Sequence, residues 1–255
     1  MADLKKPENI MELIKFQRDL MKKYFRYIND LVKSQYKKAA LLSYWLRDYL
    51  HFLQTERDFN PSFNMAYQRG QIVYVNFGYR IGSELGGARY AIVLDVHNAR
   101  SNSQLTVIPM KRKREKATAY STIYHVDLYN EISLLLQRKS LAIIDEETIK
   151  IQSLIEEYGM DGLKKNRIAK KELAKSKRRL THAQEIKAFM ETKMSSGSIA
   201  DVGQICTISK MRIIHPLKNT DVLFDIRLSD EIMSRLEDKI RYLYLSKEKV
   251  DEPEI

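Results

Sequence analysis

Strand-forming sequence occurs in two blocks, and the helical stretch 133–195 lies between them. Short runs rich in β-branched and aromatic residues, bounded by turn residues, are typical of strands. Because these strands are short and are joined by loops, they favour a small antiparallel barrel over alternating βαβ units. The chain must therefore bring two distant blocks into one β unit, which opens at about residue 66 and closes after residue 198. The runs are 71–79, 89–98, 103–111 and 121–128 in the first block, and 200–214 and 221–228 in the second.

The regions outside the blocks have helical periodicity. Apolar residues recur every three or four positions through 8–57, and no glycine or proline lies between Pro7 and Pro61. This pattern fits one long helix or a helical hairpin, with residues 33–38 as the favoured break. Pro61 then ends the helix.

The later helices also carry boundary signals. Within the arm, Tyr158–Gly162 predicts the turn, and Ser195–Ser198 predicts the end. A last helix is predicted after Ser229, because serine is a favoured N-cap and two acidic residues follow it.

The charge of the chain favours an anionic partner. Its formal net charge is +11 and its pI is about 9.5, which places nucleic acid first among the candidates. Lysine-rich solvated helices explain the same composition equally well. The basic segment 164–179, with nine Lys or Arg and one Glu, could extend an RNA footprint, contact an acidic partner protein, or form a solvated face.

Cysteine and histidine usage argues against a metal or cofactor. Cys206 is the only cysteine, which excludes a disulfide framework or a cysteine-based zinc site within one chain and suits a reducing cytosol. The five histidines, at 51, 97, 125, 182 and 215, lack metal-ligand spacing. The start of the chain lacks the apolar core of a signal peptide, and no apolar run is long enough to span a membrane. We expect a cytoplasmic protein without a membrane partner.

The segment Arg80–Asp95 contains a glycine-rich loop followed by an arginine. Three of the nine glycines of the chain, Gly82, Gly86 and Gly87, fall within six residues, and Arg89 follows them. Glycine permits positive φ and close approach of a ligand to the backbone. An arginine after such a loop can bind two phosphate oxygens through its rigid fork of donors.

This segment resembles the opening of PemK/MazF-family toxins. Their pattern is Arg-Gly, a strand, a Gly-Ser-Glu-x-Gly-Gly-x-Arg loop and a β-branched strand, and the chain reads "RGQIVYVNFGYRIGSELGGARYAIVLD". "LTVIPMK" resembles their third strand, and "ADVGQICTISKMRI" resembles their later Gln-Ile-x-Thr-Ile segment. The likeness covers about 66–132 and 197–246. Residues 1–62 and 133–196 are then an N-terminal helical extension and a helical insertion arm.

The resemblance implies an α+β protein with an SH3-like small antiparallel β-barrel and a C-terminal helix, usually a homodimer. It also implies a sequence-selective, metal-independent endoribonuclease that acts on RNA and is neutralised by an antitoxin protein. Metal is not needed for such cleavage, because the RNA 2′-hydroxyl is itself the nucleophile and leaves a 2′,3′-cyclic phosphate and a 5′-hydroxyl. The enzyme must align the reacting atoms, neutralise phosphate charge and transfer protons.

Two residues are the catalytic candidates. Arg89 matches the family's central arginine and could neutralise charge that builds on the phosphate. Lys111 stands where the family has threonine, and a lysine could stabilise the phosphorane or protonate the leaving oxygen. Loss of the threonine hydroxyl could equally weaken the enzyme, and Tyr90 is a second departure, from the family's proline.

RNA contacts are predicted around these residues. The loop amides could hold the RNA backbone, and Ser83 or Glu84 could read a base edge. Phe77 and Tyr79 could stack on a base or belong to the core. Gln204 and Thr207 are expected to be structural or to face a dimer partner. The predicted RNA-binding set is Phe77, Tyr79, Gly82, Ser83, Glu84, Leu85, Gly86, Gly87, Arg112, Lys113 and Arg114.

Other functions remain open from sequence. The same fold could serve as a nucleic-acid-binding or protein-binding module that has lost catalysis, or as a toxin of another target such as a topoisomerase. The N-terminal helices are rich in apolar and aromatic residues, which must be buried on the chain's own barrel, across a dimer or against another protein. We expect these helices to act as a control or dimerisation element.

Overall fold

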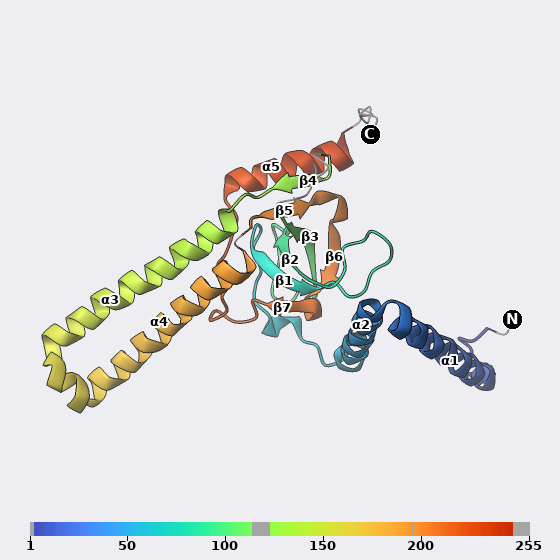
Figure 1. Cartoon of the computed structure of the whole chain (residues 1–255), viewed down its shortest axis with the longest axis horizontal. Coiled ribbons are helices and arrows are strands. Elements are labelled where there is room, and N and C mark those ends of the chain that lie inside the picture. Colours follow the sequence, from blue (N-terminus) through green and yellow to red (C-terminus); the bar gives the residue numbers. More distant parts are fainter. Residues whose placement is uncertain (1–2, 114–122, 195, 247–255) are drawn as a thin grey trace. The chain divides into compact units, whose positions relative to one another are not determined.

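The computed structural model describes residues 3–113, 123–194 and 196–246, and the chain divides into two units (Figure 1). The smaller unit contains the chain up to Phe59 together with Gly78–Gly82. The larger unit contains Asn60–Phe77 and the chain from Ser83 onward. None of the helices in these ranges has the length and apolar character that crossing a membrane requires.

The N-terminal unit contains two helices, not one long helix. Helix α1 spans Ile10–Ser34 and helix α2 spans Tyr36–Thr55. The break falls at Gln35, within the predicted range, where the backbone leaves helical geometry and its N–H donates to the Leu31 carbonyl over 2.7 Å. Most apolar side chains of these helices remain exposed within the chain.

Trp45 of α2 packs on the backbone at Gly78. A Cβ added to Gly78 would lie 2.6 Å from the indole ring, and the φ of +76° is one that side chains rarely adopt. Only glycine therefore permits this contact. The contact joins α2 to residues 78–82, which lead into the glycine loop.

We predict that Gly78→Val displaces the indole ring and shifts Trp45 fluorescence to longer wavelength. Trp45 is the only tryptophan of the chain, so its emission reports this contact directly. Gly82→Val is the matched control, because Gly82 also has positive φ but no atom within 4 Å of the added Cβ. Equal red shifts in the two variants would contradict the close packing.

The larger unit is built on one antiparallel sheet, which confirms the α+β class. Its path runs β4-β5-β3-β2-β1-β7, and β6 also pairs with β3. Two separate sequence blocks thus share one sheet, as the sequence predicted. The strands are β1 Ile72–Asn76, β2 Ala88–Val93, β3 Gln104–Arg112, β4 His125–Asp127, β5 Ser198–Asp201, β6 Cys206–Ser209 and β7 Ile213–His215.

Strand β3 joins the two blocks. Its first part pairs with β6, its middle with β2 and its last part, Met110–Arg112, with β5. Strands β4 and β7 form the two ends of the sheet and do not pair with each other within the residues described. The sheet is therefore open there, and the predicted SH3-like barrel is not confirmed.

Each face of the sheet carries an apolar core, because alternate side chains point to opposite faces. Ile92 and Ile108 lie in one core with residues of helix α5 (Asp230–Ile240). Ala91 and Val107 lie in the other core with Tyr67. The position of a residue along β2 or β3 thus decides which face it reaches.

The inserted arm consists of two helices that pack along each other (Figure 1). Helix α3 spans Glu131–Lys165 and α4 spans Arg167–Lys193. The chain reverses at Asn166, whose side chain accepts the N–H groups of Ile168 and Ala169. The predicted turn at Tyr158–Gly162 is confirmed in part, since the backbone leaves helical geometry at Gly159, with a φ of 63°, before the reversal at Asn166.

The predicted strand at 221–228 is also wrong. Asp221 accepts the backbone N–H groups of Leu217 and Lys218 and so forms a turn. Only one isolated bridge, Gln71 to Arg227, reaches the sheet from this segment. The apolar residues that suggested a strand instead cover the α5 core. Ser229 caps α5 as predicted, accepting the N–H of Ile232.

Candidate active site

Arg89 and Lys111 lie on the same face of the sheet, on the neighbouring strands β2 and β3. The pairing of these strands ends at Ala91 with Pro109, and the alternation of side chains places Arg89 and Lys111, two residues further along each strand, on the face of that pair. Ala91 points into the core that contains Val107, so Arg89 and Lys111 continue this face beyond its apolar part. The two residues predicted to be catalytic thus share one face of the sheet, on neighbouring strands.

The side chain of Arg89 is held against the glycine loop. Its Nε–H donates to the Gly86 carbonyl over 2.6 Å, and the residue is half-buried. A guanidinium has five N–H donors. One bond can therefore orient the group and leave further donors for a phosphate.

Gln204 fixes the shape of the loop. It belongs to a short 3-10 helix that follows β5, Val202–Gln204. Its side-chain oxygen accepts the Leu85 N–H over 2.7 Å, and its side-chain nitrogen donates to the Ser83 carbonyl over 3.1 Å. This is the structural role predicted for Gln204. Thr207 pairs its hydroxyl with that of Thr106 on β3.

Lys111 is part of a charged cluster that the sequence did not reveal. Its Nζ lies 2.6 Å from Asp201 Oδ2 and 3.2 Å from His125 Nε2. His125 Nε2 lies 3.3 Å from the same Asp201 oxygen. Asp201 is 4% exposed, whereas Lys111 is 29% exposed. A buried carboxylate therefore anchors a partly exposed cation and a mostly buried imidazole, whose side chain is 15% exposed.

The register of three strands explains the cluster. Asp201 pairs with His125 between β5 and β4, and Lys111 pairs with Ile199 between β3 and β5. Because Ile199 and Asp201 share a face, all three charged side chains meet there. The available sequence signal was weak: single polar residues in short apolar strands, far apart in the chain.

The negative charge of Asp201 affects Tyr244, which lies just after α5. Burial raises the pKa of Tyr244, and the negative charge of Asp201 raises it further. The Tyr244 hydroxyl donates to the carbonyl of Val202, the residue after Asp201. This π-helical turn, Arg241–Leu245, thus lies beside the Lys111 cluster.

The basic run after Lys111 has partners of its own. Arg112 is exposed and donates to Ser196 Oγ. Lys113 forms an ion pair with Asp127 and lies over the ring of Tyr129. Arg114 lies outside the described residues. The predicted phosphate patch is therefore partly neutralised by the protein itself.

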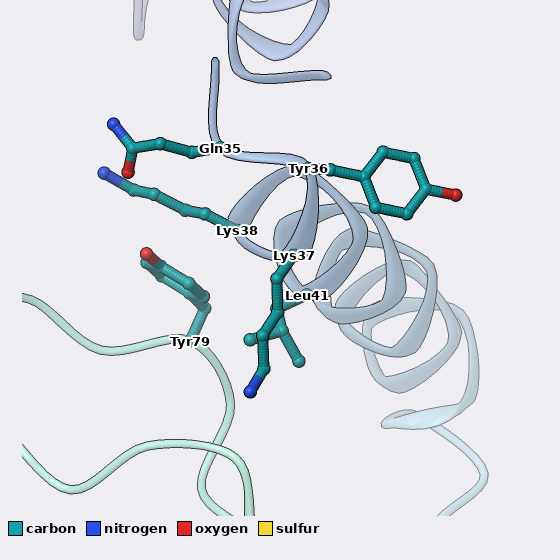
Figure 2. Close-up of a pocket in the computed structure, with 6 residues that line it drawn as sticks. All are labelled: Gln35, Tyr36, Lys37, Lys38, Leu41 and Tyr79. Atoms are coloured by element: carbon teal, nitrogen blue, oxygen red, sulfur yellow. The ribbon is translucent and has the colours of Figure 1, made fainter. Parts of the chain in front are cut away.

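The two aromatic candidates have different positions. Phe77 is 2% exposed in the Val107 core. Of the two roles that the sequence left open, stacking on a base or packing in the core, it has the second, and it presents no face to a base. Tyr79 belongs to the N-terminal unit, where it lines a hollow of about 450 Å³ with Gln35, Lys38 and Leu41. Figure 2 shows Tyr79 and Lys38 on the same side of α2, with Tyr36 pointing away.

The arrangement can neutralise a phosphate and move protons. Arg89 supplies fixed N–H donors, Lys111 supplies a cation, and His125 supplies an imidazole, a group suited to proton transfer near neutral pH. Within the part of the chain that the structure describes, no three His, Cys, Asp or Glu side chains are grouped so as to hold a metal ion.

Residues 68–183 match the family model of PemK-like, MazF-like toxins of type II toxin–antitoxin systems. The matched range begins just before β1 and ends within α4. It includes the glycine loop, Arg89, Lys111 and His125. No curated protein matches the chain.

Proposed function

Because residues 68–183 match the family model of PemK-like, MazF-like toxins, we propose that this protein is a sequence-selective endoribonuclease that cleaves single-stranded RNA without a metal ion. Members of this family are generally endoribonucleases, and a type II system pairs each toxin with an antitoxin. The observation that carries the proposal is the common face of Arg89 and Lys111 beside the glycine loop.

The chemistry follows from the side chains on that face. The 2′-hydroxyl attacks the adjacent phosphorus and its proton passes to His125. The P–O5′ bond breaks, and the leaving 5′-oxygen takes a proton from Lys111. Arg89 neutralises the charge that builds on the phosphate oxygens. His125 Nε2 lies 3.2 Å from Lys111 Nζ, so the proton can return directly and restore both groups.

Asp201 has a supporting role in this proposal. Its carboxylate lies against both Lys111 and His125 and balances their charge when the imidazole gains a proton. The family's threonine is absent, and the cluster supplies the proton transfers in its place. We expect the loop amides of Ser83–Gly87 to hold the RNA backbone.

The remaining parts of the proposal follow the family. We propose a cytoplasmic homodimer built on an SH3-like barrel, 66–132 with 197–246, and neutralised by its antitoxin. The helical extension 1–62 and the arm 133–196 are additions to this domain. An antitoxin that covers the RNA-binding face would block cleavage of mRNA, and translation would then continue.

Incubation of a long mixed-sequence RNA with the protein and EDTA tests this function. We expect discrete cuts that carry 5′-hydroxyl and 2′,3′-cyclic phosphate ends, because the nucleophile belongs to the RNA. Mapping of these ends also gives the recognition motif. Absence of cleavage by folded protein, with RNA binding retained, would favour the binding module instead.

A further inference from the structure

A cavity of about 370 Å³ opens on the face of the sheet opposite to Arg89 and Lys111. Strands β1, β2 and β7, helix α4 and the turn before α5 contribute its walls. Its size lies within the range of small-molecule sites. The proposed cleavage chemistry uses none of its residues.

Aromatic rings form the inner walls. Tyr74 and Tyr90 are opposite each other in the β1–β2 register, and their ring centroids lie 4.7 Å apart. Phe189 of α4 stands nearly perpendicular to Tyr90, at 89° and 6.0 Å. These rings can hold a flat ligand by stacking on one side and by edge contact on another.

Hydrogen-bond donors and hydrogen-bond acceptors line the rim of the cavity. Lys193 and Thr220 can donate, and Glu185 can accept. His215 Nδ1 lies 3.5 Å from Asp221 Oδ2, and Asp221 is fixed by the backbone of the turn. Burial, and then Tyr74, raise the pKa of Tyr90 to about 12, so its hydroxyl keeps its proton. The rim therefore offers donors and acceptors, of which the Asp221 carboxylate is fixed.

We propose that this cavity binds a nucleobase of the RNA. A base has two flat apolar faces and an edge that both donates and accepts hydrogen bonds, which is what the rings and the rim together match. An aliphatic side chain of a partner protein would leave the polar rim unused. Lys193 at the mouth can meet a phosphate of the same nucleotide.

This inference rests on the proposed function, since the base is taken to belong to the RNA substrate. The cavity lies on the other face of the sheet from the reacting groups, so it contributes to affinity and base preference and not to bond cleavage. A base several nucleotides from the cut is its expected occupant.

Titration with 2-aminopurine riboside 5′-monophosphate, whose fluorescence falls on stacking, tests the site. We expect saturable quenching by the wild-type chain and competition by one of the four natural nucleoside monophosphates above the others. Phe189→Ala should bind the probe about 5- to 150-fold more weakly, the usual effect of losing one stacking ring. Phe63→Ala, which removes a ring that is 87% exposed outside the cavity, should bind as wild type.

Thr220→Leu provides a second variant that disturbs no packed side chain, because Thr220 is exposed. A leucine there narrows the mouth and should also weaken probe binding. The proposal would be overturned if wild type showed no saturable quenching. It would also be overturned if the Phe189 and Thr220 variants bound the probe as tightly as wild type. Probe binding and RNA cleavage are measured separately on the same protein, so failure of cleavage and failure of this site are separate results.

Discussion

Arg89→Ala is expected to lower kcat/KM for RNA cleavage by about 10³-fold, because it removes donors aimed at the charge that builds on the phosphate. The variant should fold normally, since Arg89 is half-buried and the hydrogen bond lost among the described residues is the one from Nε to the Gly86 carbonyl. Single-turnover cleavage and RNA binding, measured on the same oligonucleotide, separate lost chemistry from lost affinity. We expect the loss mainly in the cleavage rate.

Arg89→Lys is the matched control for charge. Lysine keeps the positive charge but lacks the planar fork that binds two oxygens. It should recover only a small part of the activity. An alanine variant that cleaves within about tenfold of wild type would mean that Arg89 only shapes the loop.

Asp201→Asn is expected to lower the free energy of unfolding more than a substitution in an exposed ion pair does. Asp201 is 4% exposed and lies against Lys111 and His125. Removal of one partner from a buried ion pair typically costs about 3 kcal/mol or more, because the other charge stays buried without compensation. Because Lys111 is 29% exposed, water compensates part of its charge, and we expect a loss at the low end of this range, about 3 kcal/mol in denaturant unfolding, together with loss of cleavage.

Asp127→Asn is the matched control for this prediction. Asp127 of β4 pairs with Lys113, which follows β3, and this pair is more exposed than the Asp201 pair, at 29% and 43%. Exposed pairs contribute about 1 kcal/mol or less. Equal losses for the two variants would show that burial of Asp201 does not set its contribution.

The sequence predicted those elements whose local pattern agrees with their place in the fold. Strands β1, β2 and β3 fell where β-branched and aromatic residues concentrate, and the break at Gln35 fell within its predicted range. The segment 221–228 failed because its apolar residues cover a core from a turn. Asn166 was missed because its side-chain cap gives a weaker sequence signal than the glycines before it.

The candidate site was only partly predictable. Arg89 and Lys111 came from the family pattern, and their shared face required the register of β2 with β3. His125 and Asp201 could not be paired from sequence, because only the antiparallel register of β4 with β5 brings them together across the whole arm. Phe77 resembled a stacking residue, but the sheet face decides its burial.

Cleavage of one oligonucleotide with and without a single 2′-hydroxyl tests the central claim most directly. The oligonucleotide would contain the mapped cut site, and the second version would carry 2′-deoxyribose at the nucleotide on the 5′ side of that cut. We predict that the all-ribose strand is cut in EDTA and that the 2′-deoxy strand is bound but stays intact. Cleavage of both strands would contradict the account, because the nucleophile would then not be the RNA's own hydroxyl.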